Sequence, residues 1–349
     1  MQNITICNNL SAELVQSVDQ CSHQNIFILT DEHTHRYCLP QLDLSRLKGV
    51  HTIVIGAEDV NKNISTLSDV WCKLSKGGAT RHSLLINLGG GMVTDLGGFA
   101  AATFKRGINF INIPTTLLAM VDASVGGKTG INFNGLKNEI GAFCDAKHVL
   151  IDCQFLKTLN MENILSGYAE MLKHGLISNE LHWLELIKYD FMSMDYDRLQ
   201  QLVKASIEVK EKVVRKDPHE RNIRKSLNLG HTVGHAFESF ALKMQHPVLH
   251  GYAVAWGLVC ELYLSYIKCG FPKDKMYHTI DFIKHHYGKL HFSCKDYDLL
   301  YELMMHDKKN LTANEINFTL LSDIGRVEID HKASKDEIFE LLDFYCEAL

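Results

Sequence analysis

The sequence predicts two domains of different fold class: an α/β domain with a parallel sheet, followed by a mostly α-helical domain. Three observations support this prediction. Short apolar runs alternate with helical stretches over the first 150 residues, three glycines directly follow one of these runs, and apolar residues recur at helical spacing after about residue 155. Strands that alternate with helices form parallel, doubly wound sheets. We therefore place the domains at residues 1–155 and 156–349.

Five apolar runs are the predicted strands of the first domain. They lie at residues 25–30, 51–56, 83–88, 108–114 and 148–152. Residues 63–78, between the second and the third run, have a helical pattern. Parallel strands need such crossovers, so this alternation favours a parallel sheet.

The second domain is predicted to be helical because its apolar residues recur every three to four positions. This spacing is found at residues 164–177, 202–214, 231–244 and 336–348. The most apolar segment, residues 252–267, contains Glu261 and is too short to span a membrane, so we predict a buried helix. Residues 316–322 are the one run in this half that resembles a strand.

The overall composition excludes several classes of protein. A net charge of −5 over 349 residues argues against a nucleic-acid-binding surface but allows a local basic pocket for a small anion. None of the ten cysteines has Cys-x-x-Cys spacing, and the first residues lack the pattern of a signal peptide. We therefore expect a cytoplasmic protein with reduced thiols and no membrane partner.

The segment VDASVGGKTGIN, residues 121–132, contains the Gly-Lys-Thr ending of a phosphate-binding P-loop. A P-loop needs a glycine at position 122, where this chain has Asp122, whose carboxylate would repel a phosphate. The motif therefore serves another ligand. A capped loop with a solvated lysine is the simpler interpretation, but it does not explain the many polar groups of this apolar stretch. These are Thr115, Thr116, Asp122, Ser124, Lys128, Thr129, Lys137 and Asn138.

A glycine turn lies between a predicted strand and a predicted helix at Gly89, Gly90 and Gly91. Glycines there let the backbone approach a pyrophosphate at a helix N-terminus. The dinucleotide fingerprint would need glycine at position 94, which is Thr94. A tight strand-to-helix turn without a ligand is the alternative.

Histidines in apolar helical segments suggest a metal site. His231 and His235 lie four positions apart and so share one helix face, a spacing that suits a metal. The pattern is not that of a zinc protease, because Thr232 replaces the required glutamate. Glu170 is a further possible ligand. A histidine pair is more often surface or core, and the spacing leaves the ligating histidines open among His174, His231, His235 and His250.

Basic residues are concentrated in three segments of the second half. Solvated helix faces are the ordinary interpretation of such charges, and a pocket for phosphate or carboxylate is the sharper one. The residues are Lys210, Arg224, Lys308 and Lys309.

Taken together, these motifs resemble those of the 3-dehydroquinate synthase family over nearly the full chain. The runs NLGGGMVTDLGGFAAATFKRG, IPTTLLAMVDASVGGKTGIN, LKNEIGAF, GYAEMLKHG, LNLGHTVGHAFE, HGYAVAWG and DKKN occur in the family's order and spacing. The run VDASVGGKTG is close to diagnostic for sugar-phosphate cyclases, the superfamily that contains this family. The resemblance indicates that the Gly-Lys-Thr segment binds substrate and cofactor.

The resemblance implies a Rossmann-like NAD-binding domain, a helical metal- and substrate-binding domain, and a zinc ion that cobalt could replace. The implied lyase reaction converts 3-deoxy-D-arabino-heptulosonate 7-phosphate (DAHP) to 3-dehydroquinate and phosphate in the shikimate pathway to chorismate and aromatic amino acids. It proceeds by transient oxidation by NAD, phosphate elimination and aldol closure.

The resemblance also assigns roles to individual residues. The implied zinc ligands are Glu170, His231 and His250, while His235 faces the phosphate end of the substrate. The implied substrate pocket contains Asp122, Lys128, Asn138, Lys173, Lys210, Arg224, Asn228 and Lys308. Arg106 would reach the phosphate site of a neighbouring subunit, which implies a homodimer. The implied NAD contacts are Asp59, Lys62, Gly89, Gly90, Gly91, Asp95, Thr115, Thr116, Lys128, Lys137 and Thr158.

The chain departs from the family pattern at Tyr252, Pro218 and Asn222, where the family commonly has Glu, Glu and Gly. None of the residues assigned above is lost. Three other functions remain as alternatives: a cyclase that makes an inosose or a valiolone, a polyol dehydrogenase of the iron-activated type, and an inactive binding protein. Lys210, Arg224 and Asn228 match the dehydroquinate pattern rather than that of the other cyclases.

Overall fold

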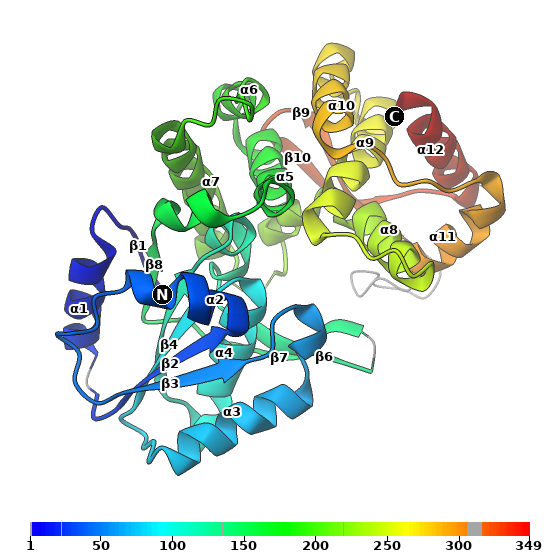
Figure 1. Cartoon of the computed structure of the whole chain (residues 1–349). Coiled ribbons are helices and arrows are strands. Elements are labelled where there is room, and N and C mark those ends of the chain that lie inside the picture. Colours follow the sequence, from blue (N-terminus) through cyan, green and yellow to red (C-terminus); the bar gives the residue numbers. More distant parts are fainter. Residues whose placement is uncertain (1, 22, 135, 219, 306–315) are drawn as a thin grey trace. The chain divides into compact units, whose positions relative to one another are not determined.

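The structure is a computed structural model that describes residues 2–21, 23–134, 136–218, 220–305 and 316–349. The chain divides into two compact units, Met1–Asn160 and Met161–Leu349 (Figure 1). Each unit has its own buried core.

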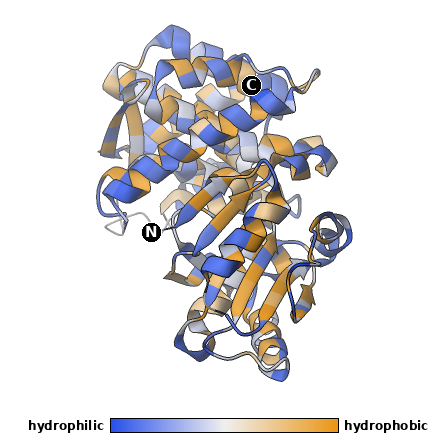
Figure 2. Ribbon diagram, turned by 90° about the vertical axis from the view of Figure 1, so that its left-hand side faces the viewer, coloured by the Kyte–Doolittle hydropathy of each residue, from blue (hydrophilic) through white to orange (hydrophobic). Residues whose placement is uncertain are grey.

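A parallel six-stranded sheet forms the core of the first unit. Its strand order is β1-β8-β5-β4-β2-β3. The central strands are almost continuously apolar and buried, as expected of a sheet covered on both faces, and Figure 2 shows their apolar colouring. The strands are β1 (Asn3–Ile6), β2 (Ile26–Asp31), β3 (Val50–Ile55), β4 (Leu84–Gly89), β5 (Asn109–Pro114) and β8 (His148–Ile151).

Four α-helices accompany this sheet: α1 (Leu10–Gln20), α2 (Glu32–Tyr37), α3 (Ile64–Lys76) and α4 (Gly91–Thr103). Helix α4 lies unusually close to its neighbours because it contains two adjacent glycines. A Cβ atom on Gly97 would lie 2.0 Å from Asn87 Oδ1, and one on Gly98 would lie 2.5 Å from Thr129 Cγ2. Only glycine allows this approach, which fixes the helix directly against strand β4 and the hairpin that follows.

An antiparallel hairpin that the sequence analysis did not predict follows β5. Its strands are β6 (Lys128–Phe133) and β7 (Leu136–Phe143). Short helical turns complete the unit: η1 (Leu39–Gln41), η2 (Asp59–Asn61), η3 (Phe104–Arg106), η4 (Ala119–Ala123) and η5 (Cys153–Thr158).

Helices dominate the second unit, as predicted. They are α5 (Met161–Ser178), α6 (Glu180–Ile187), α7 (Tyr196–Lys216), α8 (His231–Lys243), α9 (His250–Cys269), α10 (Lys273–Tyr287), α11 (Tyr297–Met305) and α12 (Lys335–Ala348), with short turns η6 (Ile223–Asn228) and η7 (Cys294–Asp296). The antiparallel strands β9 (Asn317–Asp323) and β10 (Arg326–Lys332) form a small sheet, so the expectation of a single strand was wrong.

Helix α9 is the central element of the second unit and is buried over most of its length. It crosses α8 and α5 at glycines, where main chain meets main chain. A Cβ atom on Gly257 would lie 2.0 Å from Gly230 O, and one on Gly251 would lie 1.8 Å from Ser166 O. These contacts leave little freedom for the three helices to shift. No described helix is both long enough and apolar enough to cross a lipid bilayer.

Candidate active site

Three helices of the second unit each bring one possible metal ligand to a common point. Glu170 lies within α5, and His231 and His250 are the first residues of α8 and α9. The Nε2 atoms of His231 and His250 lie 3.3 Å and 3.5 Å from Glu170 Oε1. Three potential ligands from distant parts of the sequence therefore converge on one small volume.

Glycine contacts beside two of the ligands explain how this convergence is maintained. Gly251 follows His250 and packs against the backbone of α5 at Ser166, whose Oγ also accepts a hydrogen bond from Gly251 N at 3.1 Å. Gly230 precedes His231 in a left-handed conformation, with φ of +79°. The ligands are therefore positioned by helix crossings rather than by loops.

Hydrogen bonds fix which nitrogen of each imidazole carries a proton. His231 Nδ1 lies 3.1 Å from the carbonyl oxygen of Leu229, which can only accept, so Nδ1 must donate. His250 Nδ1 lies 3.2 Å from Glu238 Oε2, and a carboxylate likewise requires a proton on this nitrogen. In a neutral ring, the Nε2 lone pair of each histidine then faces Glu170 and is available to a metal.

Glu170 is completely buried and carries a charge, which requires compensation. Its Oε2 accepts from the buried ammonium of Lys173, while Oε1 accepts no hydrogen bond from the described residues. Burial alone would raise the pKa of Glu170, but Lys173 and His231 hold it well below its usual value. Burial would lower the pKa of His250, yet Glu238 and Glu170 raise it to about 10 in the metal-free protein.

These atoms fit a zinc ion. Zinc bonds of about 2.0–2.1 Å in a tetrahedron place neighbouring ligand atoms about 3.3–3.4 Å apart. The two nitrogen-to-oxygen distances, 3.3 Å and 3.5 Å, are close to this value. With both rings neutral, two imidazole lone pairs and one carboxylate oxygen are directed at the same cation, which is a donor set typical of zinc.

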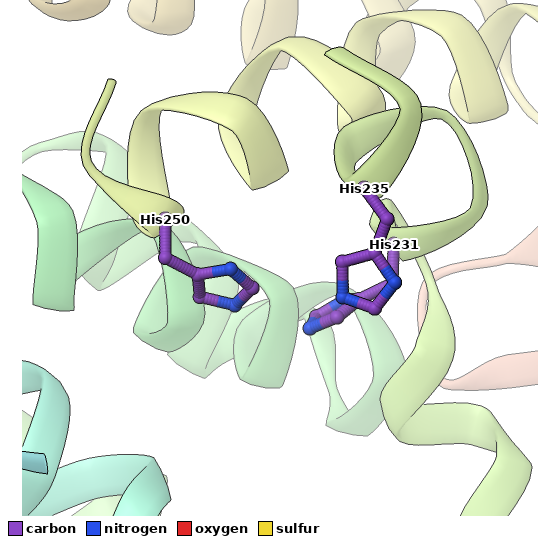
Figure 3. Close-up of side chains that lie close together, drawn as sticks. All are labelled: His231, His235 and His250. Carbon is purple, nitrogen blue, oxygen red and sulfur yellow. The ribbon is translucent and has the colours of Figure 1, made fainter. Parts of the chain in front are cut away.

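His235 is a third histidine at the same place. The ring centres of His231, His235 and His250 lie 5.3, 5.4 and 5.9 Å apart, and Figure 3 shows the rings around one small region. One potential ligand atom from each lies within 4.8 Å of the others. Of the histidines that the sequence left open, three therefore gather here, and His174 is fully buried on α5.

Among the described residues, four cationic side chains are buried, and all four were predicted as site residues. They are Lys62, Lys173, Lys210 and Arg224. Burying a cation is costly, so it needs a compensating structural or functional role.

Arg224 is held by a loop centred on Asp217. The carboxylate of Asp217 accepts from the backbone N–H groups of Arg221, Asn222 and Arg224 at 3.0, 2.6 and 3.1 Å. Arg224 Nη1 donates to Pro218 O at 2.6 Å. Pro218 and Asn222, where the chain departs from the family pattern, contribute main-chain atoms to this loop. The change of side chain at these positions therefore leaves the contacts in place.

Asn228 and Tyr252 of the second unit each contact neighbouring side chains. Asn228 Nδ2 donates to Glu220 Oε1 at 3.1 Å. The ring of Tyr252 meets the rings of Trp256 and Tyr287 edge to face, so this departure has an aromatic environment. Lys308 lies outside the described residues.

In the first unit, five predicted residues form one polar cluster. Lys62 Nζ donates to Asp95 and to Asn138, and Lys137 lies 3.6 Å from Asp59. Asn132 joins the two halves, because its backbone N donates to Lys62 O at 2.8 Å and its side chain donates to Asp59 at 3.0 Å. Asn138, assigned by resemblance to the substrate, thus lies with residues assigned to NAD.

The glycine turn occupies a distinctive place in the first unit's sheet. Strands β2 and β4 are neighbours, but the chain leaves them toward opposite edges, which defines a topological switch point. Dinucleotides bind at this point in doubly wound folds. Gly90 gives α4 no side-chain cap, so the first N–H groups of the helix receive no hydrogen bond from the cap residue's side chain.

Other predicted residues of the first unit lie near this turn or at the surface. Thr115 N donates to Gly89 O at 3.0 Å, and a Cβ on Gly90 would lie 3.0 Å from Thr116 Cγ2. Asp122 is half-buried in η4. Arg106, Lys128 and Thr158 are exposed, as are Asp59, Lys137 and Asn138 of the polar cluster.

Two buried carboxylates were missed by the sequence analysis as site residues. Glu238 contacts His250, and Glu261 accepts three backbone N–H groups at the start of α8. Glu238 follows His231 by seven positions and His235 by three, which places all three residues on one helix face. This spacing could have identified Glu238 from the sequence. For Glu261, the sequence offered one signal only, which is a single charged residue within an apolar helix.

The fold of the chain resembles that of solved synthases. The structure superposes on 2-epi-5-epi-valiolone synthase from Streptomyces hygroscopicus with a TM-score of 0.87, 24% identity, and coverage of 99% of this chain and 97% of that one. A 2-deoxy-scyllo-inosose synthase gives a TM-score of 0.85 at 22% identity, covering 98% and 96% of the two chains. At these identities the likeness establishes the fold.

The chain belongs to the 3-dehydroquinate synthase family. The family model for the N-terminal part of 3-dehydroquinate synthase matches residues 52–166, and that for the C-terminal part matches residues 167–310. A 3-dehydroquinate synthase from Parabacteroides distasonis is 52% identical over 348 residues, which are 99% of this chain and 98% of that protein. The resemblance inferred from the sequence is thereby confirmed.

Proposed function

We propose that the chain is a 3-dehydroquinate synthase, a lyase that converts DAHP to 3-dehydroquinate and phosphate. The observation that carries this proposal is the convergence of Glu170, His231 and His250, in a chain 52% identical to a 3-dehydroquinate synthase. The reaction belongs to the shikimate pathway, which leads to chorismate and the aromatic amino acids.

Two cofactors are part of this proposal. Residues 1–155 bind NAD at the switch-point turn and the polar cluster of Lys62 and Asp95, and residues 156–349 bind zinc and substrate. The solved inosose synthase contains NAD⁺ and Co²⁺, and the valiolone synthase contains NAD⁺ and Zn²⁺. Because a carboxylate and two imidazoles also suit cobalt, we expect Co²⁺ to substitute for Zn²⁺.

When bound, NAD supplies a reversible hydride acceptor and zinc supplies a Lewis acid that polarises a substrate oxygen. The chain's own residues do the rest. Lys173 keeps Glu170 charged, and the Nδ1 protons of His231 and His250 leave both Nε2 atoms free for the ion.

Buried cations hold the anionic ends of the substrate. Lys210 and Arg224 supply charge in a setting from which water is largely excluded, where ionic hydrogen bonds are strong. Asn228 adds an amide, His235 faces the phosphate end, and Asp122 positions a substrate hydroxyl or a lysine. Fixing the sugar acid in this way supports both phosphate expulsion and ring closure, because orientation replaces random encounter.

The test is phosphate release from purified protein supplied with DAHP and catalytic NAD, with NADH absorbance followed in the same cuvette. We expect phosphate to be released without lasting NADH, and the release to stop on chelation of the metal. Lasting NADH without phosphate would identify a dehydrogenase. No reaction with DAHP, but phosphate release from another heptulose or hexose phosphate, would identify a different cyclase.

The active form is proposed to be a homodimer in which Arg106 serves the phosphate site of the other subunit. Arg106 is exposed, and it and Lys105 both have left-handed backbone conformations, with φ of 68° and 50°. Such strain is uncommon outside glycine and is often associated with function.

Mixing two inactive variants tests this arrangement. Arg106→Ala and Lys210→Ala subunits, unfolded and refolded together, form hybrids with one intact site if Arg106 acts across the dimer. About a quarter of wild-type activity should return, because half the dimers are hybrids with one working site. No return of activity in confirmed hybrids would place Arg106 and Lys210 in the same subunit's site.

The proposed location is the cytoplasm. All ten cysteines are free thiols, and several are buried where no partner sulfur is bonded to them. A reducing compartment preserves such thiols.

A further inference from the structure

We infer that Glu238 is a positioning residue of the metal centre, which orients the imidazole of His250 and strengthens Nε2 as a ligand. The inference rests on the proposed function, because it takes His250 as a ligand. It concerns a residue outside the set of Glu170, His231 and His250.

Glu238 contacts the ring nitrogen of His250 that lies opposite the metal position. Glu238 lies on α8 and reaches His250, the first residue of α9, with Oε2 at 3.2 Å from Nδ1. The opposite ring nitrogen, Nε2, lies 3.5 Å from Glu170 Oε1. The imidazole therefore lies between two carboxylates, one on its outer nitrogen and one beside the metal position.

The two ligating histidines differ in how their rings are held. His231 is held by a carbonyl of its own chain, Leu229 O, and its side chain is 11% exposed. His250 follows Leu249, which gives α9 no side-chain cap, and its side chain is 27% exposed. His250 thus has less surrounding structure to fix its ring, and Glu238 supplies the contact that the backbone supplies to His231.

The charge of Glu238 favours the same role. A carboxylate that accepts the Nδ1 proton pushes electron density toward Nε2 and makes it a better donor to a metal. Glu238 is largely buried, at 8% exposure, so its charge is weakly screened by water. Together with Glu170 it brings two negative charges to the surroundings of a divalent ion. Residues in this role typically change metal affinity 10–100-fold.

Glu261 provides a matched control within the same unit. It is also a buried carboxylate, and it accepts hydrogen bonds from main-chain donors at the start of α8: Gly230 N at 2.6 Å, Thr232 N at 2.9 Å and Val233 N at 3.2 Å. Its effect should be on the folding of the α8 N-terminus rather than on the proton of an imidazole. A comparison of both residues separates loss of orientation from loss of a buried charge.

The experiment compares Glu238→Gln, Glu238→Ala and Glu261→Gln with the wild-type full chain. Cobalt affinity is measured by its visible absorption in competition with a chelator, and histidine protonation by long-range proton–nitrogen NMR of the zinc-loaded protein. We expect Glu238→Ala to weaken cobalt binding about 100-fold and Glu238→Gln about 10-fold, because glutamine keeps the acceptor but loses the charge. Both should shift the Nδ1 resonance of His250, and Glu261→Gln should lower the melting temperature while leaving that resonance in place.

The outcomes separate this inference from the proposed function. Unchanged cobalt affinity and an unchanged His250 Nδ1 resonance in Glu238→Gln would overturn the role of Glu238, even if the alanine variant failed to fold. Equal losses of affinity in the Glu238 and Glu261 variants, with no change at His250, would also overturn it. A wild-type protein that bound neither cobalt nor zinc would overturn the ligand assignment itself, and with it both proposals.

Discussion

The candidate binding site at the glycine turn of the first unit consists of main-chain groups, whereas that at the metal centre of the second unit consists of side chains. At the turn, Gly89 and Gly90 have no side chains, so main-chain groups are what they can present to a ligand. At the metal centre, charged side chains such as Glu170 and Lys173 are buried to 0% and 1% exposure. Added side-chain bulk should therefore disrupt the glycine turn, and loss of charge should disrupt the metal centre.

The largest effect is expected from removing a ligand of the metal centre. His250→Ala should lose bound zinc and reduce turnover more than about 10³-fold while the fold survives, because several kcal/mol of transition-state stabilisation depend on the ion. Zinc content, turnover and circular dichroism are the measurements. His246→Ala, in the exposed segment just before α9, is the control and should behave like wild type. Full activity with stoichiometric zinc in His250→Ala would reject the ligand assignment.

The next effect compares a buried with an exposed ion pair. Lys173→Met leaves Glu170 buried without its ammonium partner and should cost about 3–5 kcal/mol of unfolding free energy in the metal-free protein. Lys137 and Asp59 in the first unit are 3.6 Å apart and both 48% exposed. Lys137→Met should therefore cost less than about 1 kcal/mol. Urea unfolding measures both, and equal costs would contradict the contrast between the units.

Glycine substitutions test the effect of added bulk in the two units. A Cβ on Gly251 would lie 1.8 Å from a backbone oxygen of α5, whereas one on Gly91 would lie 3.3 Å from Ala123 Cβ. Gly251→Ala should cost about 3 kcal/mol of stability, because two helices must separate. Gly91→Ala should keep stability but weaken NAD binding, measured by fluorescence titration. A stable Gly251→Ala variant with normal zinc content would show that the helix crossing does not position His250.

The smallest predicted effect is a pH dependence of zinc binding. The pKa of His250 is raised to about 10 in the metal-free protein, so at pH 8 zinc must displace a proton. Apparent zinc affinity should rise by up to about tenfold per pH unit toward pH 10. The protonated ring stabilises the metal-free fold fully below about pH 6.5, and this contribution declines as the pH rises toward 10.

Calorimetry at pH 8 in two buffers of different ionisation enthalpy measures this proton directly. About one proton should be released per zinc, and fewer from the Glu238→Ala variant, in which the pKa of His250 loses a cause of its elevation. Zinc binding without proton release in the wild type would contradict the environment of His250 described here.

All five predicted runs of the first unit match strands of the sheet. The runs at residues 25–30, 51–56, 83–88, 108–114 and 148–152 lie within one residue of β2, β3, β4, β5 and β8. Strand β1 was missed because its four residues, NITI, alternate polar and apolar side chains and none of them is fully buried. The β6–β7 hairpin and β10 were missed because exposed, polar or glycine-containing strands lack an apolar signal.

The metal centre was only partly predictable from local patterns. Spacing along one helix identified His231 and His235, because four residues make about one turn. Choosing His250 and Glu170 required knowing that α5 and α9 cross α8 at this point, which depends on glycines whose packing partners no local pattern reveals. Family resemblance supplied those two residues. It did not supply Glu238, whose role depends on a contact between two helices.

The separation of the three ligands along the chain has a consequence for folding kinetics. Glu170 and His250 are eighty positions apart in sequence, and they meet only after α5, α8 and α9 have crossed. Such long-range contacts form late, because loop closure must precede them. We therefore expect zinc to bind at the end of folding of the helical unit rather than to nucleate it. A chelator present during refolding should leave early helix formation unchanged and slow only the last step.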